Sequence, residues 1–190
     1  MRWSERSGKA IAYLTVSLAA ALAGIPAGAA AGQATSISGP AEIIDGDSLR
    51  IAGQSFDLAD IDAPELDQRC NKRERFYDCG RLARAALMDL TAGAEVECRP
   101  VSGQQAALQA TAAVTPRLAR CRAGGYDLSE GMVYTGWALI PPETTRQASV
   151  AAFSAIQKQA EQRQRGLWKG RFVTPWEWRE GRRLPDETGN

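Results

Sequence analysis

The chain contains no histidine, and no two of its four cysteines have CxxC spacing. Structural zinc sites are built mainly from closely spaced cysteines and histidines, so a zinc centre is disfavoured. Beyond the N-terminal segment no apolar run approaches the ~20 residues that a membrane-spanning helix needs. The 23 basic and 22 acidic residues nearly cancel, which argues against strong nonspecific nucleic-acid binding while leaving room for a local basic patch.

The N-terminal segment has the pattern of an export signal. Three basic residues precede an apolar stretch, Ile11–Gly24, and a run of small residues that ends at Ala31. The alternative is a membrane anchor, which the early interruption at Pro26 disfavours. We therefore expect a signal peptide over 1–31, one domain over 32–180 and a disordered tail over 181–190. The processed chain would have 20 basic and 21 acidic residues, a net charge of −1.

Four cysteines, an even number, lie beyond this segment: Cys70, Cys79, Cys98 and Cys121. In an exported chain an even number of cysteines indicates disulfide bonds, here two. Three pairings are open to four cysteines.

Short apolar runs separated by glycine and aspartate turns predict strands, and apolar repeats at three and four residues predict helices. The predicted strands are Glu42–Ile44, Ser48–Ile51, Phe56–Leu58, Val96–Cys98 and Leu118–Cys121. The predicted helices are Gly80–Leu90, a helix from Asp127 to Gly136 with a capping box, and Ala148–Arg165. We expect 66–78 to be a polar loop, 99–115 a long loop, and Trp168, Trp176 and Trp178 to cover the core. This order suggests an α+β domain with a small barrel.

Four acids sit at turns that end the first strands: Asp45, Asp47, Asp62 and Glu65. A hard cation takes several oxygen ligands from different backbone segments, and this pattern can supply them. The alternative is that Asp45 and Asp47 only shape a turn. Asp57 lies between the two acidic turns, where a site that handles phosphate would want a cation.

From Pro40 to Arg179 the chain resembles the thermonuclease family, the staphylococcal-nuclease-like proteins. The order and spacing of several short motifs carry the resemblance. They are Ile44-Asp45-Gly46-Asp47-Ser48, Ile61-Asp62-Ala63-Pro64-Glu65 with Gln68, Cys79-Gly80, Leu118-Ala119-Arg120-Cys121, Asp127-Leu128, Gly136-Trp137-Ala138 and Arg165-Gly166-Leu167-Trp168. The resemblance implies an α+β fold, a five-stranded OB-type β-barrel with three helices.

The resemblance also implies a calcium site and a catalytic carboxylate. It places metal ligation on Asp47, Asp62 and the backbone carbonyl of Ala63, and it gives Glu65 the position of the general base. Phosphodiester hydrolysis uses a metal to neutralise phosphate oxygens and a carboxylate to prepare the attacking water.

Two departures from the family pattern concern the arginines that hold the phosphate. Asp57 and Pro116 stand at the two positions where the family has arginine. Losing one such donor commonly costs about 10²–10³-fold in rate, and an aspartate also places like charge beside the phosphate. Arg117, Arg50 and the basic segment Arg69–Arg75 are the candidate replacements.

From the residues and the resemblance together we expect disulfides Cys70–Cys79, which flank one polar segment, and Cys98–Cys121, which end two strands that the family fold pairs. We expect a secreted or periplasmic monomer that keeps a divalent-cation site but has weak or no phosphodiesterase activity. Such a protein would act in binding or as an accessory, with weak or no nucleic-acid binding and an envelope protein or polysaccharide as partner. The alternatives are an active calcium-dependent nuclease acting on DNA and RNA, and a structural cell-envelope or exopolysaccharide-associated module.

The export signal predicts a processed protein whose N-terminus lies between Ala30 and Gln33, because the small-residue run ends there. N-terminal sequencing of the protein from its native host measures this. A cytosolic chain that keeps Met1 would contradict the prediction.

Overall fold

The computed structural model describes residues 36–101, 116–142, 151–185 and 187. These residues all belong to one compact unit, Gln33–Asn190. The main sheet has the order β1-β7-β8-β4-β3-β2, and β9 pairs with β8. Its strands are β1 (Ile37–Gly39), β2 (Ala41–Ile43), β3 (Ser48–Ile51), β4 (Gln54–Leu58), β7 (Val96–Pro100), β8 (Arg117–Ala123) and β9 (Tyr126–Asp127).

The sheet forms a nearly closed barrel because β1 and β2 are two halves of one bent strand. Only Pro40, which has no backbone N–H to donate, separates them. β1 pairs with β7 and β2 pairs with β3, so this strand joins the two ends of the sheet. Counting β1 and β2 as one strand, the barrel has five strands, as predicted, and β4 pairs with β8 in parallel. The α+β, OB-type fold is thereby confirmed.

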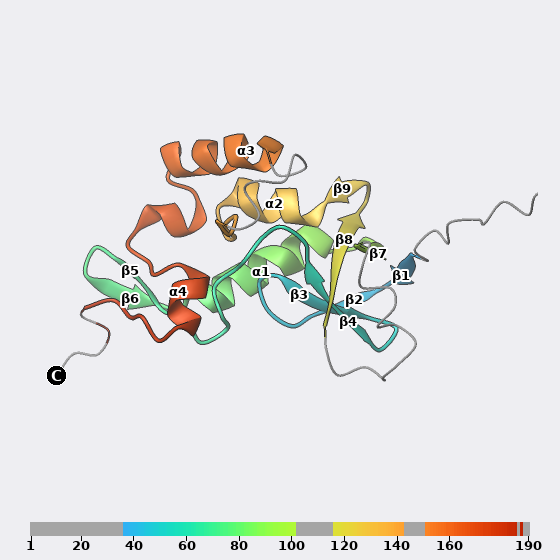
Figure 1. Cartoon of the computed structure of the whole chain (residues 1–190), viewed down its shortest axis with the longest axis horizontal. Helices are drawn as coiled ribbons and strands as arrows, with labels where there is room; N and C mark the ends of the chain where they lie inside the picture. Colours follow the sequence, from blue (N-terminus) through green and yellow to red (C-terminus); the bar gives the residue numbers. More distant parts are fainter. Residues whose placement is uncertain (1–35, 102–115, 143–150, 186, 188–190) are drawn as a thin grey trace, which may run out of the picture. The chain divides into compact units, whose positions relative to one another are not determined.

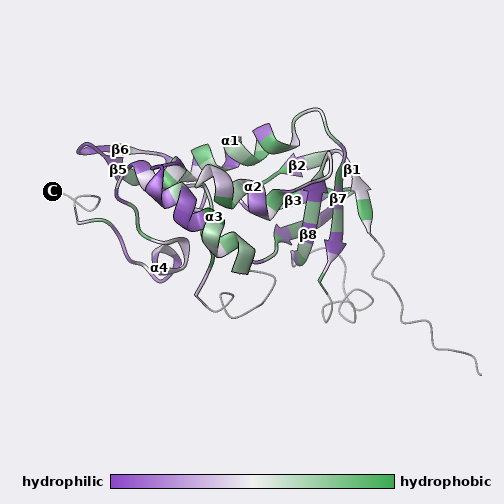
Figure 2. Cartoon of the chain, turned by 90° about the horizontal axis from the view of Figure 1, so that it is seen from above, coloured by the Kyte–Doolittle hydropathy of each residue, from purple (hydrophilic) through white to green (hydrophobic). Residues whose placement is uncertain are grey.

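The barrel interior is filled by alternate residues of its strands, as a period of two requires. Leu49, Ile51, Phe56, Leu58 and Val96 are almost fully buried, and small residues fill the inward positions of β8. Apolar side chains of α1 and α2 join the same core. Figure 2 shows hydrophobic and hydrophilic residues interleaved along these helices and strands.

The helices are α1 (Cys79–Thr91), α2 (Leu128–Thr135), α3 (Ala151–Gln162) and the short α4 (Pro175–Arg179), with a 3-10 turn, η3 (Gly166–Lys169), before α4. The predicted cap of α2 is present: the Asp127 side chain accepts the Glu130 N–H, and Gly136 ends the helix in the left-handed conformation. α3 packs on α2 (Figure 1). None of the helices in these ranges is long and apolar enough to cross a membrane.

The expectation of a loop over 66–78 was wrong. This segment contains a separate hairpin of β5 (Cys70–Lys72) and β6 (Arg75–Tyr77). In Figures 1 and 2 the hairpin lies at the end of the unit away from β1 and β7. The hairpin was missed because its polar, charged strands lack the apolar alternation that identifies a half-buried strand.

The C-terminal segment also differs in part from expectation. The fourth helix, α4, was not predicted, and the described residues after it make contacts where we expected disorder. Leu184 is 7% exposed, and the Arg183 guanidinium stacks on the Trp178 ring. Trp168 and Trp176 pack against a second apolar cluster beside the hairpin, in agreement with their predicted covering role. The predicted start of α3 at Ala148 and most of the 99–115 loop lie outside the described residues.

Two disulfides join the cysteines in the predicted pairing. Cys98 and Cys121 are direct partners in the β7–β8 register, and their bond closes a separation of 23 residues. Cys70 and Cys79 connect the start of the hairpin to the start of α1 over a separation of 9 residues. In the structure's described portion no cysteine is free.

Replacing Cys98 and Cys121 together by alanine should lower the free energy of unfolding by about 3 kcal/mol, and the same change at Cys70 and Cys79 should cost somewhat less, because the shorter loop restricts the unfolded chain less. Urea denaturation of the two double variants measures both values. A larger loss from the Cys70 and Cys79 pair would contradict this loop-length account.

Candidate active site

The turn between β2 and β3 is shaped by Asp45. Its Oδ1 atom accepts the N–H groups of Asp47 at 3.1 Å and Ser48 at 2.7 Å. This is the turn-forming role that the sequence left as an alternative for Asp45. Gly46 fits the turn because a Cβ at this position would come within 2.7 Å of the Ala63 Cβ. The turn therefore lies directly against the Ile61–Glu65 segment.

Asp47 connects this turn to the second acidic segment. Its backbone carbonyl accepts the Leu58 N–H at 2.7 Å, and its Oδ2 accepts the Ala63 N–H at 2.7 Å. Burial raises the pKa of the Asp47 carboxyl well above its usual value, and the charges of Asp45 and Asp62 raise the pKa further, while the hydrogen bond from Ala63 opposes the shift. Asp47 thus links two turns through a carboxylate that is costly to ionise.

Asp62 is held in place by both its backbone and its side chain. Its backbone N–H and carbonyl exchange hydrogen bonds with Leu139 at 2.8 and 2.9 Å, which forms an isolated bridge to the segment after α2. The residue is only 7% exposed. A buried carboxylate needs a charge partner, because its desolvation is otherwise unfavourable.

The turn that carries Glu65 is tied to the rest of the chain by the buried amide of Gln68. The Gln68 N–H donates to the Glu65 carbonyl at 2.8 Å, and Gln68 Nε2 donates to the Val173 carbonyl at 2.7 Å. A Cβ at Gly80 would come within 1.8 Å of the Glu65 carbonyl oxygen, so glycine is required where α1 begins. The position of Glu65 therefore depends on α1 and on the C-terminal segment together.

Arg179 is the cation that pairs with both acids of this segment. Its Nη1 lies 2.8 Å from Asp62 Oδ1 and 2.8 Å from Glu65 Oε1, and its Nη2 lies 2.5 Å from Asp62 Oδ2. The contact with Asp62 is bidentate, which is the strongest hydrogen-bonding arrangement between an arginine and a carboxylate. Hydrogen bonds to Asp62 are the largest cause that raises the pKa of the Arg179 guanidinium, so it stays charged.

Arg179 is the last residue of α4, whose start is fixed by a capping box. The Thr174 and Glu177 side chains cap the helix, and Pro175 is its first residue. Thr174 directly follows Val173, which Gln68 binds, so α4 is anchored beside the turn that carries Glu65. The sequence did not reveal this role of Arg179: its partners are 114 and 117 residues away, and no local pattern links them.

Asp57 and Pro116, the positions where arginine was expected, lie on neighbouring strands or next to them. The Asp57 Oδ1 accepts the Ser48 hydroxyl at 2.8 Å across the β3–β4 pair. Burial raises the pKa of the Asp57 carboxyl, with a smaller contribution from Asp45, while the Ser48 hydrogen bond opposes the shift. Pro116 is exposed and immediately precedes β8. Neither residue offers a cation to a phosphate.

Three of the candidate replacement arginines, Arg50, Arg117 and Arg69, have other partners. Arg50 pairs with Glu42 at 2.9 Å, and Arg117 Nη1 donates to Gln54 Oε1 at 2.5 Å. Arg69 lies 3.8 Å from Asp78 and over the Phe76 ring. Among the described residues, Arg179 is the basic side chain that pairs with Asp62 and Glu65. It was not among the arginines expected from the sequence.

The expected metal ligands have protein partners in this arrangement. Both oxygens of Asp62 bind Arg179, and an oxygen of Asp47 binds the Ala63 N–H. Within the described ranges no group of three or more Asp, Glu, Cys or His side chains is placed to hold a metal ion. The acids converge only in part: Asp47 lies within electrostatic range of Asp45 and Asp62, and Asp57 within range of Asp45.

Comparisons with known proteins agree with the OB-type fold described above. A family model described as staphylococcal nuclease homologue matches residues 55–170, more than half of the chain. The succinoglycan biosynthesis protein ExoI of Rhizobium meliloti (strain 1021) is 45% identical over 58 residues. That match covers 30% of this chain and 30% of ExoI, so the chain spans less than a third of the length of this relative.

Asp47→Asn should stabilise the protein at neutral pH. Because folding raises the pKa of Asp47, the wild-type protein loses stability as pH rises from the unfolded-state pKa to the higher folded-state pKa, and the loss is complete above that value. Asparagine can still accept the Ala63 N–H and does not ionise. Thermal denaturation in EDTA should show the two proteins converging near pH 4 and the variant more stable at pH 8.

The matched control for this comparison is Asp67→Asn, because Asp67 is an exposed aspartate outside the turn that carries Asp47. It should leave the pH dependence of stability unchanged. If Asp47→Asn destabilised the protein equally at pH 4 and pH 8, the assigned cost of ionising Asp47 would be wrong.

Proposed function

Because this chain belongs to the staphylococcal nuclease family, we propose that it is an exported member that hydrolyses phosphodiester bonds weakly or not at all and acts as a binding or accessory protein. The contact of Arg179 with Asp62 and Glu65 is the observation that carries this proposal. The guanidinium neutralises the two acids that the family resemblance assigns to metal binding and to general base catalysis.

The ion pair with Arg179 makes Glu65 less suited to act as a general base. A general base must reach the proton of the attacking water, and Arg179 restrains the Glu65 side chain through a charged hydrogen bond to one of its two oxygens, Oε1. Opening this largely exposed ion pair costs about 0.2–1 kcal/mol.

The absence of arginine at the two expected phosphate-binding positions should also lower the rate of hydrolysis. Asp57 and Pro116 supply no cation, and Arg50 and Arg117 are paired with Glu42 and Gln54. Each lost donor of this type costs about 10²–10³-fold in rate, although the two losses do not simply add. The expected activity of the wild-type protein is therefore close to background.

A divalent cation at this site would compete with Arg179. The family is calcium-dependent in general, and Asp47 and Asp62 lie within electrostatic range of each other. Calcium prefers several carboxylate and carbonyl oxygens, with Ala63 as the expected source of the carbonyl. Asp62 can become a ligand only when Arg179 leaves it, so we propose a weak calcium site in the wild-type protein.

The proposed location is the periplasm or the exterior of the cell. Two disulfides support it, because such bonds persist in oxidising compartments and are rare in the cytosol. The N-terminal pattern of basic, apolar and small residues supports the same proposal. We propose that the exported protein is a monomer.

A second candidate function is a role associated with an exopolysaccharide. Its support is the similarity to a protein named for succinoglycan biosynthesis. Such a role needs no phosphodiester hydrolysis, so it agrees with a carboxylate site neutralised by arginine. The partner in this case would be a polysaccharide or an envelope protein, with weak or no nucleic-acid binding.

The proposal is tested by activity and calcium binding in the same set of variants. The wild-type protein should cleave DNA and RNA near background with calcium present, and its melting temperature should rise only slightly with calcium. Arg179→Gln should bind calcium roughly tenfold or more tightly, because it removes the competing charge-assisted bonds. Asp47→Ala in the same background should abolish the calcium-induced rise.

The control for Arg179→Gln is Arg163→Gln, which removes an exposed arginine just after α3 and should leave calcium binding unchanged. Asp57→Arg together with Pro116→Arg should recover some cleavage by restoring the two cations. Strong calcium-dependent cleavage by the wild-type protein, lost in Glu65→Ala, would refute the proposal and establish an active nuclease.

A further inference from the structure

A pocket of about 390 Å³ lies between the hairpin and the helical part of the domain. This volume is within the ~300–1,000 Å³ range that is usual for small-molecule sites. It is lined by Lys72, Arg75, Phe76, Tyr77, Leu82, Trp137, Gly166 and Lys169. None of these residues belongs to the carboxylate site of Asp47, Asp62, Glu65 and Arg179.

The walls of this pocket are fixed by covalent and backbone links. The Cys70–Cys79 disulfide joins the hairpin to α1, which carries Leu82. Asn71 and Arg171 exchange backbone hydrogen bonds of 2.8 and 2.7 Å, which tie the hairpin to the chain just after Lys169. The site is therefore largely preformed, and binding of a ligand would cost little conformational entropy of the protein.

Three of the side chains that line the pocket are cationic. Lys72, Arg75 and Lys169 come from three separate segments, β5, β6 and η3, and each is exposed. None of the three forms a salt bridge within the described residues. Three cationic residues that line one pocket and have no salt-bridge partner among the described residues favour an anionic ligand. The planar guanidinium of arginine also matches the planar geometry of a carboxylate.

The remaining lining is apolar and mostly aromatic. Phe76, Tyr77 and Trp137 are partly buried, so each ring is held by packing, and Leu82 is 45% exposed. Trp137 packs against both apolar clusters of the domain, which fixes its ring. Partly exposed aromatic rings of this kind present flat faces on which the C–H groups of a sugar ring can pack.

We propose that this pocket binds a carboxylate-bearing saccharide. The carboxylate meets Lys72, Arg75 and Lys169, and the sugar ring packs against Phe76, Tyr77 and Trp137. The same chemistry is offered by a free sugar acid and by an acidic unit within a glycan chain, and the pocket is open to both sources.

Nucleic acid fits these observations less well. Proteins that hold single strands combine base stacking with a basic groove that follows the phosphate backbone, whereas here the cations surround one pocket. The lining contains no amide or carboxylate side chain that could read a base edge. The balance of 23 basic and 22 acidic residues also gives no broad field for a polyanion.

Calorimetric titration of the full chain with defined probes tests the pocket. The probes are galacturonate, a galacturonate trimer, the uncharged galactose trimer and a thymidylate trinucleotide. The acidic trimer should bind at least tenfold more tightly than the uncharged trimer and the trinucleotide. Equal affinity of galacturonate and its trimer per site indicates a free sugar acid as the ligand, and tighter binding of the trimer indicates a glycan unit.

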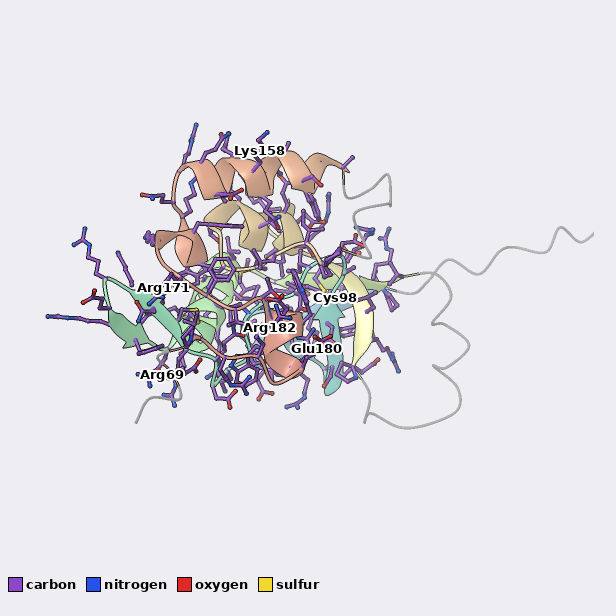
Figure 3. All side chains as sticks on the ribbon, turned by 60° about the vertical axis from the view of Figure 1, so that its left-hand side comes forward. Arg69, Cys98, Lys158, Arg171, Glu180 and Arg182 are labelled. Atoms are coloured by element: carbon purple, nitrogen blue, oxygen red, sulfur yellow. A yellow bond between two sulfur atoms is a disulfide. The ribbon has the colours of Figure 1, made fainter. Side chains whose placement is uncertain are left out.

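The variant Lys72→Gln with Lys169→Gln should weaken binding of the acidic trimer by tenfold or more, while its thermal stability stays close to that of the wild type. Lys158→Gln is the matched control, because Lys158 is an exposed lysine on α3 outside the pocket (Figure 3). Binding unaffected by the double change, preference for the trinucleotide or the uncharged trimer, or no binding of any probe would overturn the proposal. Nuclease activity is not a readout here, so this outcome is separate from that of the proposed function.

Discussion

The acidic site depends on one electrostatic constraint: carboxylates that lie close together, at least one of them buried, are stabilised by a positive charge among them. In this chain the Arg179 guanidinium supplies that charge to Asp62 and Glu65. Members of this family are expected to use a metal ion and two arginines for the same region, and here the arginine positions are Asp57 and Pro116. A fixed side chain thus pairs with the two acids to which the family resemblance assigns metal ligation and general base catalysis.

This arrangement depends on the contacts that position the C-terminal segment. Gln68 binds both the Glu65 turn and Val173, and the capped helix α4 begins immediately afterwards. The carboxylate site is therefore built from the first strands of the barrel and from the last helix. The hairpin β5–β6 is fastened to the same segment through Arg171, so the acidic site and the cationic pocket share one scaffold. The net charge of the sequence is close to zero, so it gives no sign that acidic and basic residues gather at two different sites.

Patterns in the sequence predicted the elements that have an apolar repeat. The barrel strands, α1 and the capped helix α2 were found because burial on one face imposes a period of two or 3.6 on the apolar residues. The hairpin and α4 were not found, since a polar hairpin has no such repeat and a helix of five residues is too short to show one. Similarity to the family added the cysteine pairing and the expected ligand positions.

The sequence alone determined the fold class and the acidic turns, because each is a property of local pattern, and the resemblance to the family added the expectation of arginine at positions 57 and 116. Only the tertiary structure decided which charges meet. Asp45 became a turn former, Asp47 bound the Ala63 N–H, and Asp62 paired with Arg179. Ion pairing depends on which side chains folding brings within a few ångströms, and a pair separated by 117 residues leaves no trace in local spacing.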